Sequence, residues 1–214
     1  MKNFLLILVM LLFSTNVLAS DSNNLTAAAA LEKLKKGNER FAAFKMKHPD
    51  EFRMRRTELI KGQHPFVAIL SCSDSRVPTE IVFDQGLGDI FVIRNAGNVM
   101  DEHVLGSIEY AVEHLGVNLV VVLGHESCGA VAAAMSSTKE TDAIESLKKA
   151  IEPACCECKK ENKYSYENVI KKHAKLNVEN LLKDKEFNEY IQKHNVKIIS
   201  AYYHLDTGLV DFLD

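Results

Sequence analysis

The sequence predicts an α/β protein with a parallel-core sheet flanked by helices, an N-terminal helical arm and a C-terminal edge hairpin. Three short apolar runs, at 66–70, 90–93 and 119–123, carry this prediction. Uninterrupted apolar runs of this length are typical of strands that are buried on both faces of a sheet. Residues 104–115 repeat apolar side chains at helical spacing, and a helix between two such strands is the crossover that joins parallel neighbours.

The N-terminus has the pattern of a signal peptide over residues 1–19. Lys2 gives a positive start, residues 4–13 are almost wholly aliphatic, and Val17 and Ala19 are small enough for cleavage after Ala19. The run is too short to cross a hydrocarbon core of ~30 Å as a stable anchor. We therefore expect a periplasmic or secreted protein without a membrane anchor after cleavage. The alternative is a buried or membrane-anchoring helix.

Residues 20–61 are predicted to form the helical arm. Thr26 can cap its first helix, in which apolar side chains recur at helical spacing at Leu31, Leu34, Phe41 and Phe44. Pro49 is expected to end this helix, because proline disfavours helical geometry in the residue before it. Residues 50–60 are expected to form another turn or two.

Residues 62–214 form the remaining chain. It contains the three strands given above, and helices and strands continue to alternate after the third. The expected elements are helices at 129–135, 141–151 and 165–195, a strand at 196–203 and a returning edge strand at 209–213. No internal repeat or low-complexity linker interrupts this pattern. The chain is therefore interpreted as one α/β domain behind its helical arm.

Composition agrees with a single globular domain and argues against a nucleic-acid partner. Apolar residues make up 47% of the 214 residues, which is enough for one ordinary core. The 26 basic and 29 acidic residues give a formal charge of −3 and are mixed along the chain. No basic stripe of the kind that binds a phosphate backbone is present.

Polar clusters follow two of the predicted buried strands. Cys72 comes directly after the first strand, while His125 and Cys128 come after the third. The carboxyl ends of parallel strands are where sites are assembled in such sheets. Two thiols and one imidazole are the donor set expected for Zn²⁺, and three protein ligands leave the fourth position of a catalytic site open. Isolated buried cysteines or a redox pair of Cys72 with Cys128 are the alternatives.

Asp74 and Arg76 are alternate residues beside Cys72. In an extended chain their side chains lie on one side, where the guanidinium keeps the carboxylate ionised and orients it. Such a carboxylate is a poor proton donor and a good acceptor. Near a metal it could accept a hydrogen bond from bound water, or bind the metal itself. The alternative is a surface ion pair that contributes ~0–1 kcal/mol.

The sequence resembles the β-class carbonic anhydrases. The ordered motifs that carry the resemblance are Cys72-Ser73-Asp74-Ser75-Arg76-Val77-Pro78, Val92-Ile93-Arg94-Asn95-Ala96-Gly97-Asn98, Ser107-Ile108-Glu109-Tyr110-Ala111-Val112, Leu115-Gly116-Val117 and Gly124-His125-Glu126-Ser127-Cys128-Gly129-Ala130. The resemblance extends from about residue 31 to the C-terminus.

This resemblance implies a site and a reaction. Zn²⁺ is expected on Cys72, His125 and Cys128, with water or hydroxide as the fourth ligand in an open state. In a closed state Asp74 is the fourth metal ligand, and Arg76 draws it back off the metal. The implied reaction is reversible hydration of carbon dioxide to bicarbonate and a proton by hydroxide on the zinc ion.

The resemblance also implies a substrate pocket of the plant-like type and a homodimer or homotetramer. The implied pocket residues are Gln63, Phe91, Ala96, Tyr110 and Gly129. In the family the site lies at a dimer interface, over which the N-terminal helices of the partner wrap. The arm over residues 20–61 fits that role, since its apolar stripe is expected to have little core of its own chain to cover.

Two rival functions and one cysteine cluster stay open. Relatives use the same ligands to hydrolyse carbonyl sulfide or carbon disulfide, and a zinc-binding or redox protein without turnover is a different class. An exported chain must also load zinc before its thiols oxidise. Cys155, Cys156 and Cys158 are expected to be structural; a disulfide or an adventitious metal are the alternatives.

Overall fold

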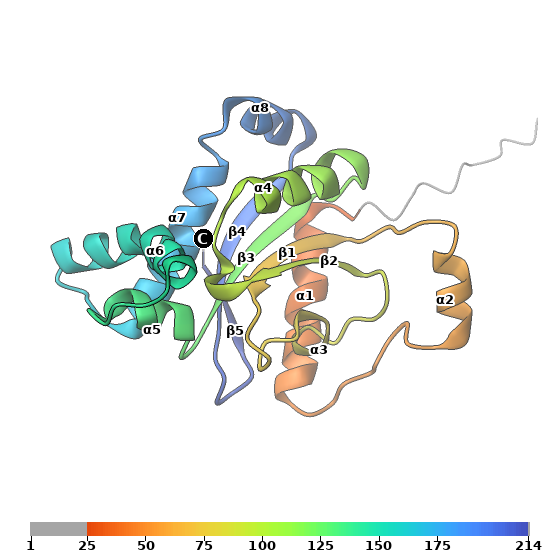
Figure 1. The fold of residues 1–214 in the computed structure, drawn as a ribbon. Coiled ribbons are helices and arrows are strands. Elements are labelled where there is room, and N and C mark those ends of the chain that lie inside the picture. Colours follow the sequence, from red (N-terminus) through yellow and green to blue (C-terminus); the bar gives the residue numbers. More distant parts are fainter. Residues whose placement is uncertain (1–24, 214) are drawn as a thin grey trace, which may run out of the picture.

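The computed structural model describes residues 25–213, so the predicted signal peptide over residues 1–19 lies outside the described residues. Five strands form one sheet in the order β2-β1-β3-β4-β5 (Figure 1). Their bounds are β1 Val67–Cys72, β2 Ile90–Asn95, β3 Leu119–His125, β4 Lys197–Tyr203 and β5 Val210–Leu213. The first four strands are parallel, and β5 is antiparallel to β4. The predicted fold class, a parallel-core α/β sheet with a C-terminal edge hairpin, is confirmed.

The strands that carry the polar clusters are neighbours at the centre of the sheet. β1 pairs with β2 on one side and with β3 on the other, and Ser71 lies opposite Leu123. Every residue of β1 and of β3 is buried, as expected for strands covered on both faces. The carboxyl ends of these strands therefore meet at one edge of the sheet.

Helices cover both faces of this sheet (Figure 1). One face packs against α1 (Ala27–Ala42) and α3 (Thr79–Val82). The other face packs against α4 (Glu102–Glu109), α7 (Tyr166–Leu181) and α8 (Lys185–His194). Beyond the carboxyl edge, α5 (Gly129–Met135) and α6 (Asp142–Lys160) pack with α7 around a third apolar cluster. This third cluster contains Cys72 and Cys128.

The helical arm begins as predicted and ends earlier. The Thr26 hydroxyl accepts a hydrogen bond from the Ala29 amide at 3.3 Å and caps α1. The helix stops at Ala42, not at Pro49 as predicted. Phe44 adopts a left-handed φ of 55°, and the Lys45 amide donates to the Arg40 carbonyl, which closes the last turn as αL-terminated helices do. A short α2 (Arg53–Leu59) follows, as expected.

The arm has a core within its own chain, which contradicts the expectation that its apolar stripe has little to cover. Ala30 and Leu34 are fully buried and pack with the β1 side chains of Val67 and Ile69. Asn38 is also buried and hydrogen-bonds the carbonyls of Val82 and Gly208. The expectation was wrong because the spacing of apolar residues in the sequence shows which side chains share one face of a helix. It does not show which surface that face packs against.

Three further helical predictions are revised. The helix over 104–115 is α4 followed by a π-helical turn, Tyr110–His114. The helix expected to end at Ile151 continues as α6 through Pro153 to Lys160, and residues 165–195 form two helices, α7 and α8. These boundaries were missed because apolar spacing predicts that a helix exists more reliably than where it stops.

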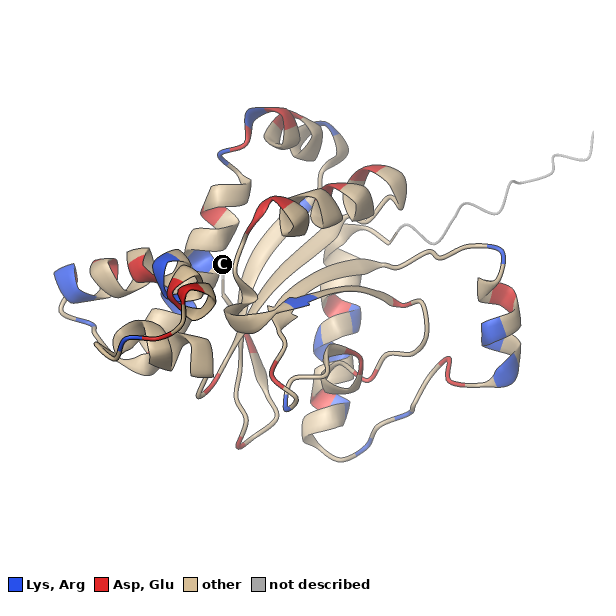
Figure 2. Cartoon of the chain, in the orientation of Figure 1, with Lys and Arg blue, Asp and Glu red and all other residues tan. Residues whose placement is uncertain are grey.

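Charged residues lie mainly on the outer helices, while the strands carry few (Figure 2). Basic and acidic residues alternate there, so no face in this view gathers a single sign. Within residues 25–213 the helices are too short or too polar to cross a membrane.

A buried carboxylate joins α1 to the segment that follows α3. Asp84 accepts hydrogen bonds from Arg40 and from the Lys47 and His48 amides. Burial opposes its charge, but these donors outweigh burial and lower the pKa of Asp84 below its usual value.

This carboxylate makes folding stability sensitive to acid. Because its folded pKa lies below the unfolded value of ~4, its contribution is complete above that pH and is lost as pH falls through the folded pKa. We expect Asp84→Asn to lower the free energy of unfolding by about 2 kcal/mol at pH 7 and by less at pH 3. Urea unfolding at the two pH values measures this. Glu39→Gln, at an exposed position of α1, is the control, and an equal effect of Asp84→Asn at both pH values contradicts the argument.

Candidate functional site

The predicted ligands meet at the carboxyl edge of the sheet. Cys72 is the last residue of β1, His125 is the last residue of β3, and Cys128 immediately precedes α5. One ligand atom from each of the three lies within 4.8 Å of the other two, and all three residues are buried. The adjacent register of β1 and β3 is what brings two residues so distant in sequence together.

A turn in an uncommon backbone conformation returns the chain from His125 to Cys128. Ser127 adopts a left-handed φ of 54°, a region that non-glycine residues rarely occupy. Upstream, Gly124 lets α7 approach β3 closely, because a Cβ there would lie 2.7 Å from the Ile170 side chain. The backbone on both sides of His125 is thus tightly constrained.

The His125 ring is oriented to offer one nitrogen. Its Nδ1 lies 2.8 Å from the Glu126 carbonyl, which can only accept, so Nδ1 carries the proton and donates. Nε2 then holds a free lone pair, and this buried atom has no hydrogen-bond partner among the described residues. Its distance of 3.9 Å to an Asp74 carboxylate oxygen is too long for a hydrogen bond. A buried acceptor left in this way is suited to a metal ion.

The two sulfurs differ in their affinity for a proton. A hydrogen bond from the Cys128 thiol lowers the pKa of Cys72, and the Gly97 amide, 3.3 Å from the Cys72 sulfur, acts in the same direction. The same sulfur–sulfur contact, together with burial, raises the pKa of Cys128. Amides at the start of α5 partly oppose that rise. The pair therefore stabilises one thiolate readily and retains a single shared proton.

Asp74 and Arg76 form the predicted ion pair beside this cluster. Arg76 donates to both carboxylate oxygens, at 2.9 and 2.7 Å, and its amide donates to one of them at 2.9 Å. These hydrogen bonds hold the pKa of Asp74 well below its usual range, so the carboxylate is ionised at every ordinary pH. Arg76 also donates to the Ser127 carbonyl at 3.2 Å, which connects the two motifs. The paired carboxylate is turned toward Arg76.

These donors fit a zinc ion. Two cysteine sulfurs and one imidazole nitrogen are its common protein ligands, and the spacing of the three atoms allows one ion to contact them together. The ligands are hydrogen-bonded as metal ligands usually are, with the Glu126 carbonyl on His125 Nδ1 and the Gly97 amide on the Cys72 sulfur. The Asp74 carboxylate is nearby and stays bound to Arg76.

Two residues of the site were present in the quoted motifs but had no predicted role. Arg94 donates to the carbonyls of Cys72 and Asp74, at 2.9 and 2.7 Å, and so fixes the backbone of the first motif. Gly97 supplies the amide that meets the Cys72 sulfur. Their position at the carboxyl end of β2 and in the turn that follows it, within a motif rich in polar and small residues, was the available signal.

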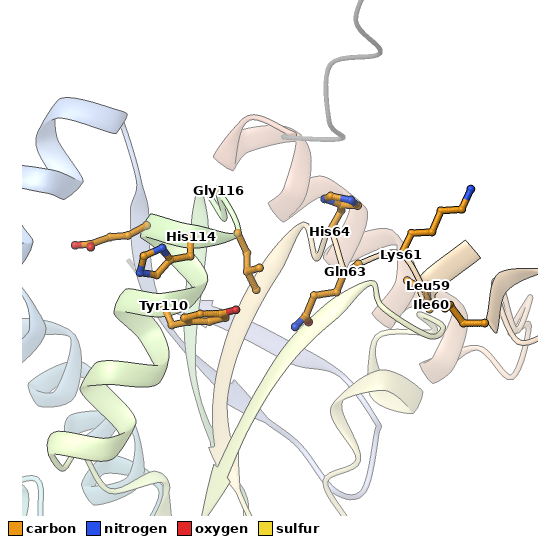
Figure 3. A pocket seen from close by; sticks show the side chains of 11 residues that line it. Leu59, Ile60, Lys61, Gln63, His64, Tyr110, His114 and Gly116 are labelled. Carbon is orange, nitrogen blue, oxygen red and sulfur yellow. The ribbon is translucent and has the colours of Figure 1, made fainter. Parts of the chain in front are cut away.

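The predicted pocket residues fall into two groups. Ala96 and Gly129 are exposed beside the ligand cluster, one after β2 and the other at the start of α5. Gln63 and Tyr110 instead line a cavity of about 750 Å³ at the amino ends of β1 and β3, which they approach from opposite sides (Figure 3). The Phe91 ring packs near Tyr110, with ring centroids 6.2 Å apart.

The second group is therefore remote from the ligands of its own chain. Gln63 precedes the first residue of β1 and Cys72 is its last, and a strand of six residues spans roughly 20 Å. Within one chain, Gln63, Phe91 and Tyr110 do not line the ligand cluster.

The three cysteines of α6 are unpaired thiols. Cys155 and Cys158 face the third apolar cluster, and burial raises the pKa of both. Cys156 is exposed on the other side of the helix. Buried neutral thiols of this kind behave as small apolar side chains.

Comparison with known proteins agrees with this site. The sequence profile of the family described as carbonic anhydrase matches residues 67–210. Carbonic anhydrase 2 of Mycobacterium tuberculosis is 55% identical over 117 residues, which make up 55% of this chain and 56% of that protein. The matched part thus spans little more than half the length of that relative.

Solved structures extend the likeness over most of the chain. A β-carbonic anhydrase of Sordaria macrospora, from a study of two tetrameric enzymes, superposes with a TM-score of 0.67 at 26% identity and covers 83% of this chain and 93% of its own. The β-carbonic anhydrase CafA of Aspergillus fumigatus superposes with a TM-score of 0.65 at 29% identity, over 87% and 90% of the two chains. With a profile match over two thirds of its length and this fold, the chain belongs to the carbonic anhydrase family and to its β class.

Proposed function

We propose that the chain catalyses reversible hydration of carbon dioxide to bicarbonate and a proton, with one zinc ion on Cys72, His125 and Cys128. The observation that carries the proposal is the free Nε2 of a buried, correctly oriented His125 beside two sulfurs and an ionised carboxylate. When bound, zinc supplies Lewis acidity that makes water a nucleophile near neutral pH.

The chain's own residues orient this chemistry. Asp74 is ionised and can only accept hydrogen bonds, so a water beside it must direct a hydrogen toward the carboxylate and a lone pair elsewhere. Arg76 holds the carboxylate through two hydrogen bonds and keeps it from the ligands. If Arg76 released it, Asp74 could become a metal ligand and close the site, as the family resemblance implies. Ala96 and Gly129 leave room beside the cluster for a small, uncharged substrate.

A second copy of the chain is part of the proposal. Gln63, Phe91 and Tyr110 are assigned to substrate binding by resemblance, yet they lie at the other end of the sheet from their own ligands. A homodimer, or a homotetramer built from two dimers, can bring these side chains to the ligand cluster of the neighbouring chain. We also propose that the enzyme acts after export, on the strength of the leader pattern over residues 1–19.

Stopped-flow measurement of carbon dioxide hydration by the zinc-loaded protein, with and without chelator, tests the proposed reaction. We expect turnover that the chelator abolishes and that added zinc restores. Parallel assays with carbonyl sulfide and carbon disulfide test the rival hydrolase. Turnover of those substrates without carbon dioxide hydration contradicts the proposal, as does a zinc-loaded protein that is inactive on all three.

Removal of one ligand should abolish zinc binding. Cys128→Ala leaves two ligands in place of three, and we expect metal analysis to show zinc well below one ion per chain. Cys155→Ala is the matched control, because Cys155 is a buried thiol of the same apolar cluster outside the ligand group. Full zinc occupancy in Cys128→Ala would remove this residue from the metal site.

Replacing Asp74 should separate metal binding from turnover. In Asp74→Asn the side chain can present an N–H to the water in place of an oxygen, so the orienting hydrogen bond is lost while the three ligands remain. We expect unchanged zinc content and a hydration rate about 10- to 100-fold lower, the usual cost of losing a hydrogen bond to a group on the metal. Near-normal turnover in this variant would show that Asp74 does not orient the reaction.

If each site is built from residues of two chains, two impaired variants should restore activity when they form a mixed dimer. Gln63→Ala keeps its ligands, and Cys128→Ala keeps Gln63, so a mixed dimer would contain one complete site. We expect each variant alone to be impaired, and activity to appear when the two are unfolded together and refolded as a mixture. Activity of the mixture no higher than the mean of the separate variants would contradict a site shared between chains.

A further inference from the structure

The turn that contacts the Cys72 sulfur is held from outside by α7. The turn, Ala96–Asn98, directly follows β2, and Cys72 lies opposite Asn95 in the sheet. Two of its carbonyls point to the helix: His173 Nε2 lies 3.0 Å from the Gly97 oxygen, and Asn177 Nδ2 lies 2.9 Å from the Asn98 oxygen. Both side chains are buried.

The protonation of His173 follows from its partner. The Gly97 carbonyl can only accept, so Nε2 carries the proton and donates. Burial lowers the pKa of His173 to about 4, and the ring is therefore a neutral donor at physiological pH. It adds no charge near the thiolates and acts through the position of its N–H.

The turn is fixed internally and clamped on its other side. The Asn95 side chain bridges its own turn, accepting from the Val99 amide at 2.8 Å and donating to the Val99 carbonyl at 2.7 Å. Gly97 has a φ of 74°, and a Cβ there would lie 2.8 Å from the Ala130 Cβ and 3.1 Å from the Ile151 side chain. The turn is thus a rigid unit between α5, α6 and α7, and the hydrogen bonds from α7 determine where it lies.

We propose that His173, supported by Asn177, is a positioning residue for the metal ligand Cys72, acting through the Gly97 turn. His173 holds the Gly97 carbonyl, and the amide of the same residue donates to the Cys72 sulfur at 3.3 Å. This hydrogen bond sets the direction of the sulfur toward His125 and Cys128. The inference rests on the proposed zinc site. It concerns residues 45 and 49 positions beyond the last proposed ligand, Cys128, and no feature of the motifs indicates them.

Two variants of His173, whose side chains carry the same amide group at different lengths, test the proposal. Gln can place an amide nitrogen near the position of His Nε2, whereas Asn carries the same group on a side chain one methylene shorter. We expect His173→Gln to retain wild-type zinc affinity, measured by competition with a chromophoric chelator, and His173→Asn to bind zinc about 10- to 100-fold more weakly. In the cobalt-substituted protein, the thiolate-to-metal charge-transfer band should shift in His173→Asn and not in His173→Gln.

Leu181→Ala separates positioning from stability. Leu181 is buried on α7, and its cluster does not include the turn. This variant should lower the unfolding temperature and leave zinc affinity and the cobalt spectrum unchanged. Zinc binding that is the same in His173→Gln and His173→Asn overturns the proposal, and so does weakening in Leu181→Ala equal to that in His173→Asn.

A second donor keeps the test decisive if His173→Asn does not fold. Asn177→Ala removes the bond to the Asn98 carbonyl, and we expect weaker zinc binding in the same direction; unchanged affinity overturns the proposal. A wild-type protein that binds zinc without hydrating carbon dioxide refutes the proposed function only. A wild-type protein that hydrates carbon dioxide while His173→Asn and Asn177→Ala keep full zinc affinity refutes the positioning role only.

Discussion

The site depends on the hydrogen-bonded register of three adjacent parallel strands. β1 lies between β2 and β3, and this places Cys72, the turn after Asn95 and His125 at one edge. Residues that are far apart along the chain thus become neighbours without any long loop having to order itself. Every other feature of the site is built on this edge: the Ser127 turn, the Arg76 ion pair and the helices that pack over it.

The negative charge gathered at the carboxyl edge of the sheet must be balanced by hydrogen-bond donors. The edge holds two sulfurs and the Asp74 carboxylate, and isolated anions are costly to bury. The compensation comes from three sets of donors: the Arg76 guanidinium on Asp74, the Gly97 amide on Cys72 and the amides at the start of α5 near Cys128. The amide donors belong to the backbone, so they need not reorganise when charge changes at the site.

The two ends of the sheet have different roles in the proposed enzyme. The carboxyl edge carries the ligands, while the amino edge carries an open cavity with Gln63 and Tyr110 (Figure 3). Because β1 is six residues long, a single chain holds the Cys72–His125–Cys128 cluster and the predicted pocket residues Gln63 and Tyr110 at opposite ends of the sheet. Association between copies is the route by which such a fold can combine the two.

The sequence by itself determined the elements and the donor set, and the tertiary structure decided how they combine. Apolar runs and motif spacing are local properties, and they were enough to predict the strands, the Thr26 cap, the meeting of Cys72, His125 and Cys128 at one edge and the Asp74–Arg76 pair. Contacts between residues that are distant in the sequence produce no such local pattern. The packing of Leu34 on its own sheet, the distance of Gln63 from Cys72 and the hydrogen bond from His173 to Gly97, 76 residues apart, follow from strand order and helix docking. These could be known only once the chain was folded, because they depend on which surfaces meet.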